Sequence, residues 1–222
     1  MKNIVRAYHV KEVSHIKDLD IGKKIRCHYA SGSKKVGLFS RLGLQTSTFI
    51  NEAQTVMPEG DFYFICVKRD DKEIFLIADR VIQTYISAKT IMNFLHQNQK
   101  EKKISFENYD NEFYLSIPTG GITSNDKAND WDAYIMDGIR NKSHLFSKKD
   151  WFLEGPAATW TKDKPEKVAN FENLQVVRGI GVYRKKVSGE NDNQYTYGTY
   201  TNENEATGFR PVIKVYINQE VK

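Results

Sequence analysis

Two apolar runs punctuated by glycine stand near the end of the sequence: Leu174-Gln-Val-Val-Arg-Gly-Ile-Gly-Val-Tyr183 and Ala206-Thr-Gly-Phe-Arg-Pro-Val-Ile-Lys-Val-Tyr-Ile217. Their β-branched and aromatic residues favour strands. We expect the two runs to pair with each other as the closing strands of a compact β-rich module. The stretch between them is free to vary, and surface loops carried by a rigid frame are where function concentrates.

Upstream, alternating apolar and polar stretches also predict strands. Residues 24–29 and 36–41 are expected to be joined by a turn at 30–35. Residues 61–68 and 73–82 predict the clearest hairpin, with its polar turn at 69–72. The N-terminal half is therefore predicted to be rich in β-hairpins.

Two helices are predicted. The first covers Ser87 to Asn98, with Ser87 as the N-cap and an apolar stripe made by Ala88, Ile91, Met92 and Leu95. The second is short and covers residues 130–136, capped by Asn129 or Asp130.

A chain of 222 residues holds one large or two small domains. The best candidate for a domain boundary lies within residues 107–127, which are flexible in composition. The same composition also fits a long surface loop. We therefore expect either one domain-like body or two intimately packed halves, an N-terminal half at residues 1–106 and a C-terminal half at residues 107–222.

Composition narrows the classes of protein. No apolar run reaches the roughly 18 residues that span a bilayer, so membrane insertion is not expected, and the N-terminus lacks the apolar stretch of a signal peptide. We therefore expect the chain to be made and folded in the cytoplasm. The two cysteines, Cys27 and Cys66, are expected to be buried free thiols. The net charge of +5 comes from lysines interspersed with acids, which favours a solvated surface over a nucleic-acid interface.

The sequence lacks the common catalytic signatures. It has no G-x-S-x-G elbow, no H-E-x-x-H helix and no phosphate-cradling glycine loop, and its histidines are dispersed. Neither a cofactor nor a metal is expected, although the oxygens of residues 190–193 are of the type that calcium prefers. Three carboxylate pairs keep a polysaccharide-acting hydrolase open as the alternative function: Asp70/Asp71, Asp130/Asp132 and Glu203/Glu205.

Several motifs occur in an order that resembles known proteins. Residues 129–135, a tryptophan-bearing stretch at 158–161, residues 175–179 and residues 207–213 together resemble phage and prophage tail-associated proteins of low-GC bacteria. The closing half is also similar to the formylglycine-generating-enzyme-like branch of the C-type lectin fold, with its Arg-Gly-Gly and Gly-Phe-Arg strands. Ile180 stands where that branch has its second glycine. Residues 21–29, 60–65 and 76–81 resemble the segments that precede this module.

The resemblance implies an α+β, β-rich fold with a C-type-lectin-like module in the C-terminal half. It also implies a location in the virion. The enzyme of that branch uses two cysteines in its C-terminal region, whereas this chain has none from Val67 to Lys222. We therefore expect a non-enzymatic particle protein that binds either a host cell-surface receptor or glycan, or a neighbouring virion protein in a baseplate or as a decoration. Homo-oligomers are common in such particles, and no seam in the sequence specifies a symmetry.

Within the motifs, six residues are expected to serve the scaffold: Trp131, Arg178, Gly179, Gly208, Phe209 and Arg210. The glycines suit positive φ or close strand approach, and the arginines suit forked hydrogen bonds onto loop carbonyls or onto Asp130 or Asp132. Trp131 is expected to bury its ring and to pair its N–H.

The insert at residues 184–205 is the best binding candidate. Its tyrosines lie among small polar residues, as in recognition loops, although the same alternation is typical of a twisted surface strand. The candidate binding residues are Asn191, Asn193, Tyr195, Tyr197, Tyr200 and Asn202.

Overall fold

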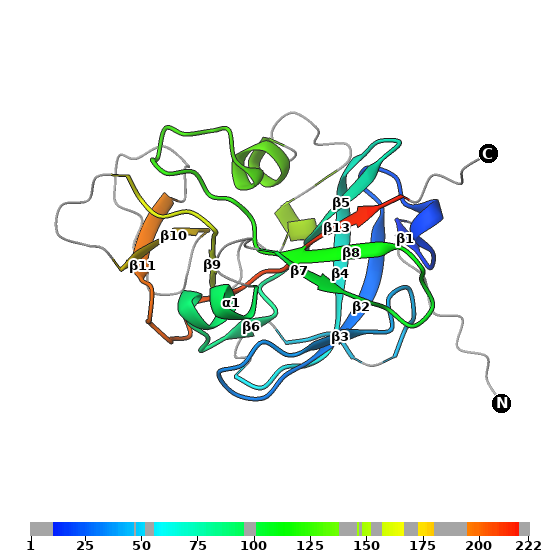
Figure 1. Cartoon of the computed structure of the whole chain (residues 1–222), viewed down its shortest axis with the longest axis horizontal. Helices are drawn as coiled ribbons and strands as arrows, with labels where there is room; N and C mark the ends of the chain where they lie inside the picture. The colour runs from blue at the N-terminus through cyan, green and yellow to red at the C-terminus, as the bar shows by residue number, and fades with distance from the viewer. Residues whose placement is uncertain are drawn as a thin grey trace.

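The computed structural model describes residues 11–46, 48–51, 56–95, 101–137, 146, 148–151, 157–166, 173–179 and 195–217. These residues form a β-rich fold with few helices, in which the strands make two sheets (Figure 1). The larger sheet has the order β1 (Glu12–Val13), β2 (Lys24–Ala30), β4 (Glu59–Arg69), β5 (Glu73–Ala78), β13 (Val212–Tyr216), β8 (Glu112–Ser116), β7 (Lys102–Ile104), and β3 (Leu38–Ser40) also pairs with β2. The smaller sheet has the order β11 (Tyr195–Thr199), β10 (Leu174–Arg178), β9 (Ala158–Trp160), β12 (Thr207–Phe209), β6 (Gln83–Thr84).

The helices are short. They are η1 (Ile16–Asp18), α1 (Ala88–Phe94), the π-helix η2 (Trp131–Met136) and η3 (Lys148–Trp151). The two sheets lie side by side along the long axis of the molecule, with β11 at one end and β1 at the other (Figure 1).

The strands predicted at 24–29, 36–41, 61–68 and 73–82 are present as β2 to β5, and the last of them ends early, at Ala78. Helix α1 begins after Ser87, whose Oγ accepts a hydrogen bond from the N–H of Thr90 at 3.2 Å. The helix ends at Phe94 with Leu95 as its C-cap, so it is shorter than the predicted span to Asn98; residues 96–98 lie outside the described part of the chain.

The predicted pairing of the two closing runs is wrong. Strand β9 lies between β10 and β12, and the second run divides into β12 and β13, which belong to different sheets. The division falls at Arg210 and Pro211, where the chain passes from one sheet to the other. Strand pairing is decided by contacts that are distant in sequence, so the apolar pattern alone could not give the partner. Pro211 directly precedes β13, a position where its missing N–H is tolerated.

A second crossing runs beside the first. Strands β5 and β6 pass between the same two sheets and pair with β13 and β12 in register. Two hydrogen bonds join the β5–β6 connection to the β12–β13 connection. The N–H of Ala78 donates to the carbonyl of Pro211 at 2.9 Å, and the N–H of Ile82 donates to the carbonyl of Phe209 at 2.8 Å. The end of the chain is therefore held by a segment more than 120 residues earlier, and the larger sheet interleaves strands from both halves of the sequence.

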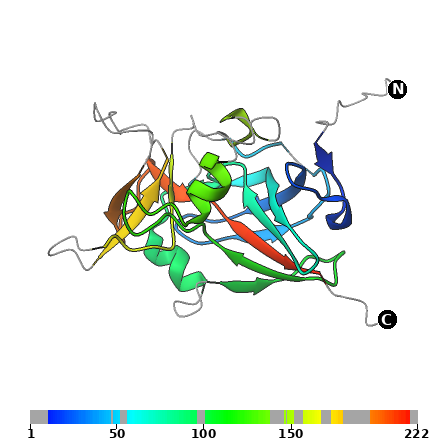
Figure 2. The same cartoon turned by 90° about the horizontal axis from the view of Figure 1, so that it is seen from above.

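Two hydrophobic cores flank the central strands of the larger sheet. Phe64 and Leu76 point into a core shared with the smaller sheet and α1. Their neighbours Ile65 and Ile77 point to the other face, where they meet η2 and Trp151. Helix η2 is the green helix near the centre of Figure 2. Since successive strand residues face opposite sides, β4, β5 and β13 are buried on both faces. None of the described helices is long and apolar enough to span a membrane.

Substitution of Gly208 tests the close approach of β12 and β6. A Cβ there would lie 2.2 Å from the carbonyl oxygen of Gln83 and 2.5 Å from Cγ1 of Val81, whereas one at Gly32 would meet nothing within 4 Å. We expect Gly208→Ala to lower the free energy of unfolding by about 3 kcal/mol, because backbone must move. Gly32→Ala should change it by under about 1 kcal/mol. Equal urea midpoints for the two variants would contradict this packing.

Because Cys27 and Cys66 are buried thiols, we expect the folded protein to lose stability at alkaline pH. Burial raises the pKa of Cys66 from 9.0 to about 12 and raises the pKa of Cys27 well above its ordinary value. Above about pH 9 the unfolded chain therefore releases protons that the folded chain retains, so the free energy of unfolding should fall as pH rises. Urea unfolding of Cys66→Ala between about pH 9 and pH 11 should show a shallower decline than the unsubstituted protein. If the free energy of unfolding fell equally with pH in both proteins, the raised pKa of Cys66 would be refuted.

Candidate binding site

The hairpin of β10 and β11 presents two tyrosines on one face of the smaller sheet. Tyr195 lies opposite Arg178 and Tyr197 lies opposite Val176. Directly opposed side chains share a face, so the two rings are neighbours along the strand. The hydroxyl of Tyr195 donates to the carbonyl of Ile122 at 2.9 Å. Tyr197 is 46% exposed and Ile122 is 45% exposed. We call Tyr195, Tyr197 and Ile122 the tyrosine patch.

Arg178 supports this patch from beneath. Its guanidinium carbon lies 5.7 Å from the centre of the Tyr195 ring. One terminal nitrogen donates to the carbonyl of Gly120 at 2.9 Å and the other to Oδ2 of Asp132 at 2.8 Å. This is the forked contact that the sequence led us to expect. Burial lowers the pKa of Arg178, and the carboxylate of Asp132 opposes that shift.

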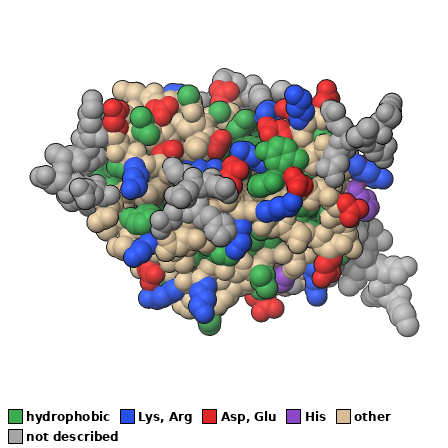
Figure 3. Space-filling view, in the orientation of Figure 1, with side chains coloured by type: hydrophobic (Ala, Val, Ile, Leu, Met, Phe, Trp, Pro, Cys, Tyr) green, Lys and Arg blue, Asp and Glu red, His purple; other side chains and the backbone are tan. Residues whose placement is uncertain are grey.

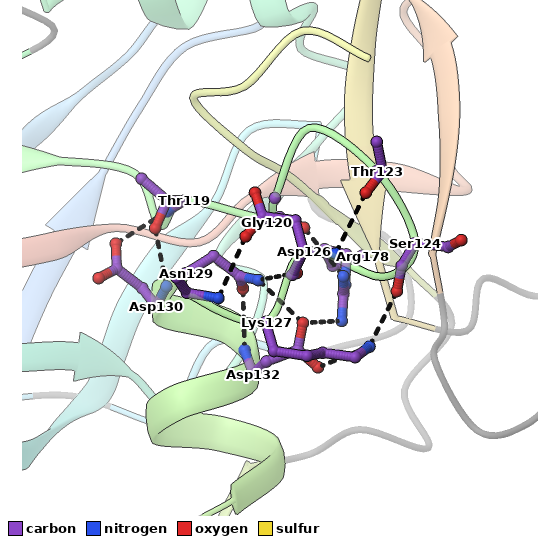
Figure 4. A network of polar contacts seen from close by, with 12 residues as sticks. Thr119, Gly120, Thr123, Ser124, Asp126, Lys127, Asn129, Asp130, Asp132 and Arg178 are labelled. Atoms are coloured by element: carbon purple, nitrogen blue, oxygen red, sulfur yellow. Dashed lines mark hydrogen bonds and ion pairs between the residues drawn. The ribbon is translucent and has the colours of Figure 1, made fainter. Parts of the chain in front are cut away.

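The loop that carries Ile122 is cross-linked by side chains (Figure 4). Oδ2 of Asp163 accepts from the N–H groups of Gly120 and Gly121 at 2.6 and 3.0 Å. Asp126 accepts from the N–H of Ile122 at 3.0 Å with one oxygen and from that of Ala128 with the other. Asp126 thus joins positions 122 and 128 of the loop, and Asp163 ties Gly120 and Gly121 to a segment about 40 residues later in the chain. These bonds fix the place of Ile122.

The side-chain hydrogen bonds of this loop also cap the N-terminal end of η2. Asn129 Oδ1 accepts from the N–H of Asp132 at 2.9 Å, so Asn129 is the capping side chain. The other expected cap, Asp130, makes no capping bond and instead accepts from the N–H of Thr119 at 2.8 Å (Figure 4).

Trp131 differs from expectation in one respect. Its ring is buried, but its N–H has no hydrogen-bond partner among the residues that the structure describes. The ring is positioned by other contacts: the guanidinium carbons of Arg178 and Arg210 lie 6.0 and 5.8 Å from its centre. A Cβ at Gly179, whose φ is +97°, would lie 3.2 Å from the ring. Packing and cation–π attraction, not the N–H, therefore set its position.

The remaining predicted binding residues are distributed differently. Tyr200 packs against the core shared by the two sheets, and its carbonyl accepts from the N–H of Lys89. Asn202 is exposed in the turn after β11, where its N–H donates to the carbonyl of Thr199. Asn191 and Asn193 lie outside the described residues. Of the six, only Tyr195 and Tyr197 are shown together on one surface.

Sequence reasoning missed Ile122 and Asp163. Both belong to stretches that look like ordinary polar loops, and residues 107–127 were considered a candidate linker. The asparagine and acid three residues apart at 129 and 132 are the one local signal of the network, because that spacing is typical of a helix cap. Nothing in the sequence linked this cap to Tyr195.

The carboxylate pairs considered for hydrolysis have bonding partners within the fold. Asp132 binds Arg178, and Asp70 accepts from the N–H groups of Lys72 and Glu73 in the hairpin turn. Glu203 Oε2 lies 2.7 Å from Lys34 Nζ, and Glu205 accepts from the hydroxyl of Tyr85.

No group of three or more His, Cys, Asp or Glu that could hold a metal ion occurs among the residues that the structure describes. Residues 190–193, considered for calcium, lie outside them. Cys27 and Cys66 are free and buried. Cys27 is opposite Phe62 in the register of β2 and β4, so Cys66 lies about 13 Å further along the strand and the two thiols do not form a pair.

Charge on the visible face of the molecule is mixed. Figure 3 shows lysine and arginine side chains interspersed with acidic ones over that face.

Comparison of the chain with protein-family models, with curated proteins and with solved structures gives no match.

The buried pair of Arg178 and Asp132 gives a direct test of this support. Arg178→Met leaves the buried Asp132 carboxylate with Asn129 and the more distant Lys127 as its partners among the described residues, and should lower the free energy of unfolding by about 3 kcal/mol. The double variant with Asp132→Asn should recover part of that loss. Lys103→Met, which breaks the exposed pair with Glu112, should cost under about 1 kcal/mol. Similar urea midpoints for Arg178→Met and Lys103→Met would show that the buried pair does not hold the loop.

Proposed function

We propose that this chain is a non-enzymatic protein of a phage or prophage particle, with a C-type-lectin-like module in its C-terminal half, and that it binds another surface through the tyrosine patch. The partner is either a host cell-surface receptor or glycan, or a neighbouring virion protein that it meets as a baseplate or decoration component. The assignment to a particle rests on the order of motifs in the sequence.

One observation carries the binding role. The rings of Tyr195 and Tyr197 stand on an edge strand, and the first of them is fixed by its bond to Ile122 and by Arg178 beneath it. Tyrosine contributes large amphipathic contact area at low entropic cost, and it is enriched among the residues that dominate binding energy. A ring held in place before binding loses little further freedom when a partner arrives.

The bonding of the acidic residues supports binding over hydrolysis. A glycosidase needs one carboxylic acid and one carboxylate facing the substrate from opposite sides. Asp132 is buried and paired with Arg178, and Asp130 accepts from the backbone of the loop. Removing either from these bonds would loosen the same loop that holds Ile122.

Binding to cells tests the proposal. We expect purified protein to be pulled down by host cells or by assembled particles, and Tyr197→Thr to weaken that binding about tenfold, because the exposed ring contributes contact area and threonine preserves the strand. Tyr216→Thr is the matched control, since Tyr216 is 39% exposed on the larger sheet. Equal losses for both variants would count against the patch.

The same samples separate binding from hydrolysis. Reducing sugar released from isolated cell wall, and abolished by Asp130→Asn, would overturn the non-enzymatic proposal. Binding to particles without binding to cells would assign the partner to the virion.

A further inference from the structure

The outer edge of β11 carries backbone groups that the described protein does not pair. Within the described residues β11 pairs with β10 alone. The N–H of Tyr200 donates to the carbonyl of Asn173 at 2.6 Å, which fixes the phase of the ladder. Hydrogen-bonded pairs alternate with non-bonded ones in an antiparallel ladder, so Thr196 and Gly198 bond to β10. Tyr195, Tyr197 and Thr199 therefore turn their N–H and C=O groups outward.

Most of these outward groups remain available. The carbonyl of Thr199 accepts from the N–H of Asn202 at 2.9 Å. That leaves the N–H and C=O of Tyr195 and of Tyr197, together with the N–H of Thr199, directed at the edge of the sheet. Groups of this kind form a template for another strand.

Within the described residues, this edge has no lysine, proline or bulge that would prevent such pairing. Lysines, prolines and bulges normally blunt an exposed edge. Residues 195–202 contain no charged residue and no proline, and the register of β10 with β11 runs without a shift. At the edge of the larger sheet, by contrast, β7 carries Lys102 and Lys103. The edge at β7 therefore carries charges that oppose strand addition, and the described edge at β11 carries none.

We propose that β11 pairs with β11 of a second copy of this chain, antiparallel, about a two-fold axis at Tyr197. In that register each Tyr197 exchanges two hydrogen bonds with its counterpart, and the N–H of each Thr199 donates to the carbonyl of the opposing Tyr195. The uncharged strand places no like charges opposite each other, which makes the contact self-complementary, as a two-fold interface requires.

This contact joins the two smaller sheets into one continuous sheet and brings the two tyrosine patches side by side on the same face. Two linked patches bind a repetitive surface more tightly than one does, without any new contact. The pairing uses backbone groups at the strand edge, so it does not depend on the proposed function.

The mass in solution tests the pairing. A five-residue edge gives a small interface, so light scattering after gel filtration should use protein up to about 100 μM. We expect a mass of twice 25.7 kDa at high concentration. A monomer at every concentration would overturn the proposal.

Charged substitutions of Tyr197, the residue at the two-fold axis, test the register of the pairing. Tyr197→Lys and Tyr197→Glu each place two like charges opposite each other, and each alone should be a monomer with an unchanged circular dichroism spectrum. Mixing the two variants should restore the dimer, because the charges are then opposite. Tyr197→Thr should remain a dimer even where it loses binding to cells, which separates failure of this inference from failure of the proposed function. Dimers formed by either charged variant alone, or no dimer in the mixture, would refute a two-fold contact at Tyr197.

Discussion

The guanidinium of Arg210 holds together the place where the two sheets meet. It is buried and donates to the carbonyls of Ala78 and Asp79 at 3.1 and 3.0 Å, to the carbonyl of Trp151 at 3.2 Å, and to Oγ1 of Thr159 at 3.2 Å. These acceptors belong to or adjoin the ends of strands in both sheets, at points where the chain leaves a ladder and its carbonyls lose their strand partners. Buried carbonyls without donors are costly, and a planar group with five N–H donors can satisfy several at once.

That junction determines where the tyrosine patch lies. The smaller sheet is attached to the larger one through β6 and β12, next to Arg210, and β10 and β11 extend from there to the end of the molecule (Figure 1). Trp131 lies between this junction and the patch, since its ring is close to both Arg210 and Arg178. A chain of contacts through Arg210, Trp131 and Arg178 thus runs from the core of the larger sheet to Tyr195, which connects the patch to the fold.

The sequence predicted elements that local chemistry decides. The hairpin of β4 and β5 follows from alternating apolar residues around a polar turn, and Ser87 begins α1 because its hydroxyl caps the first turn. The contacts of Arg178 with Gly120 and Asp132 were also predictable, since an arginine in an apolar strand needs acceptors. The partner of the closing run was not, because the segment from Ala206 to Ile217 reads as one strand and is divided between two sheets by contacts with residues 73–84. Ile122 could not be found because its carbonyl is tied to Tyr195, 73 residues away.

By itself the sequence determined that the chain is β-rich, that its helices are few and short, and that tyrosine is concentrated in one uncharged segment. The uncharged segment is residues 193–202, within the charged insert at 184–205. These properties follow from side-chain periodicity, capping and composition, which act over a few residues. Only the tertiary structure decided which tyrosines share a face, what supports them and which strand edge is open. The face of a sheet on which a side chain lies changes when the register shifts by one residue, and register is set by partners distant in the chain. Tyr195 and Tyr197 therefore came to lie on one surface and Tyr200 partly buried against the core, although all three stand in the same sequence pattern.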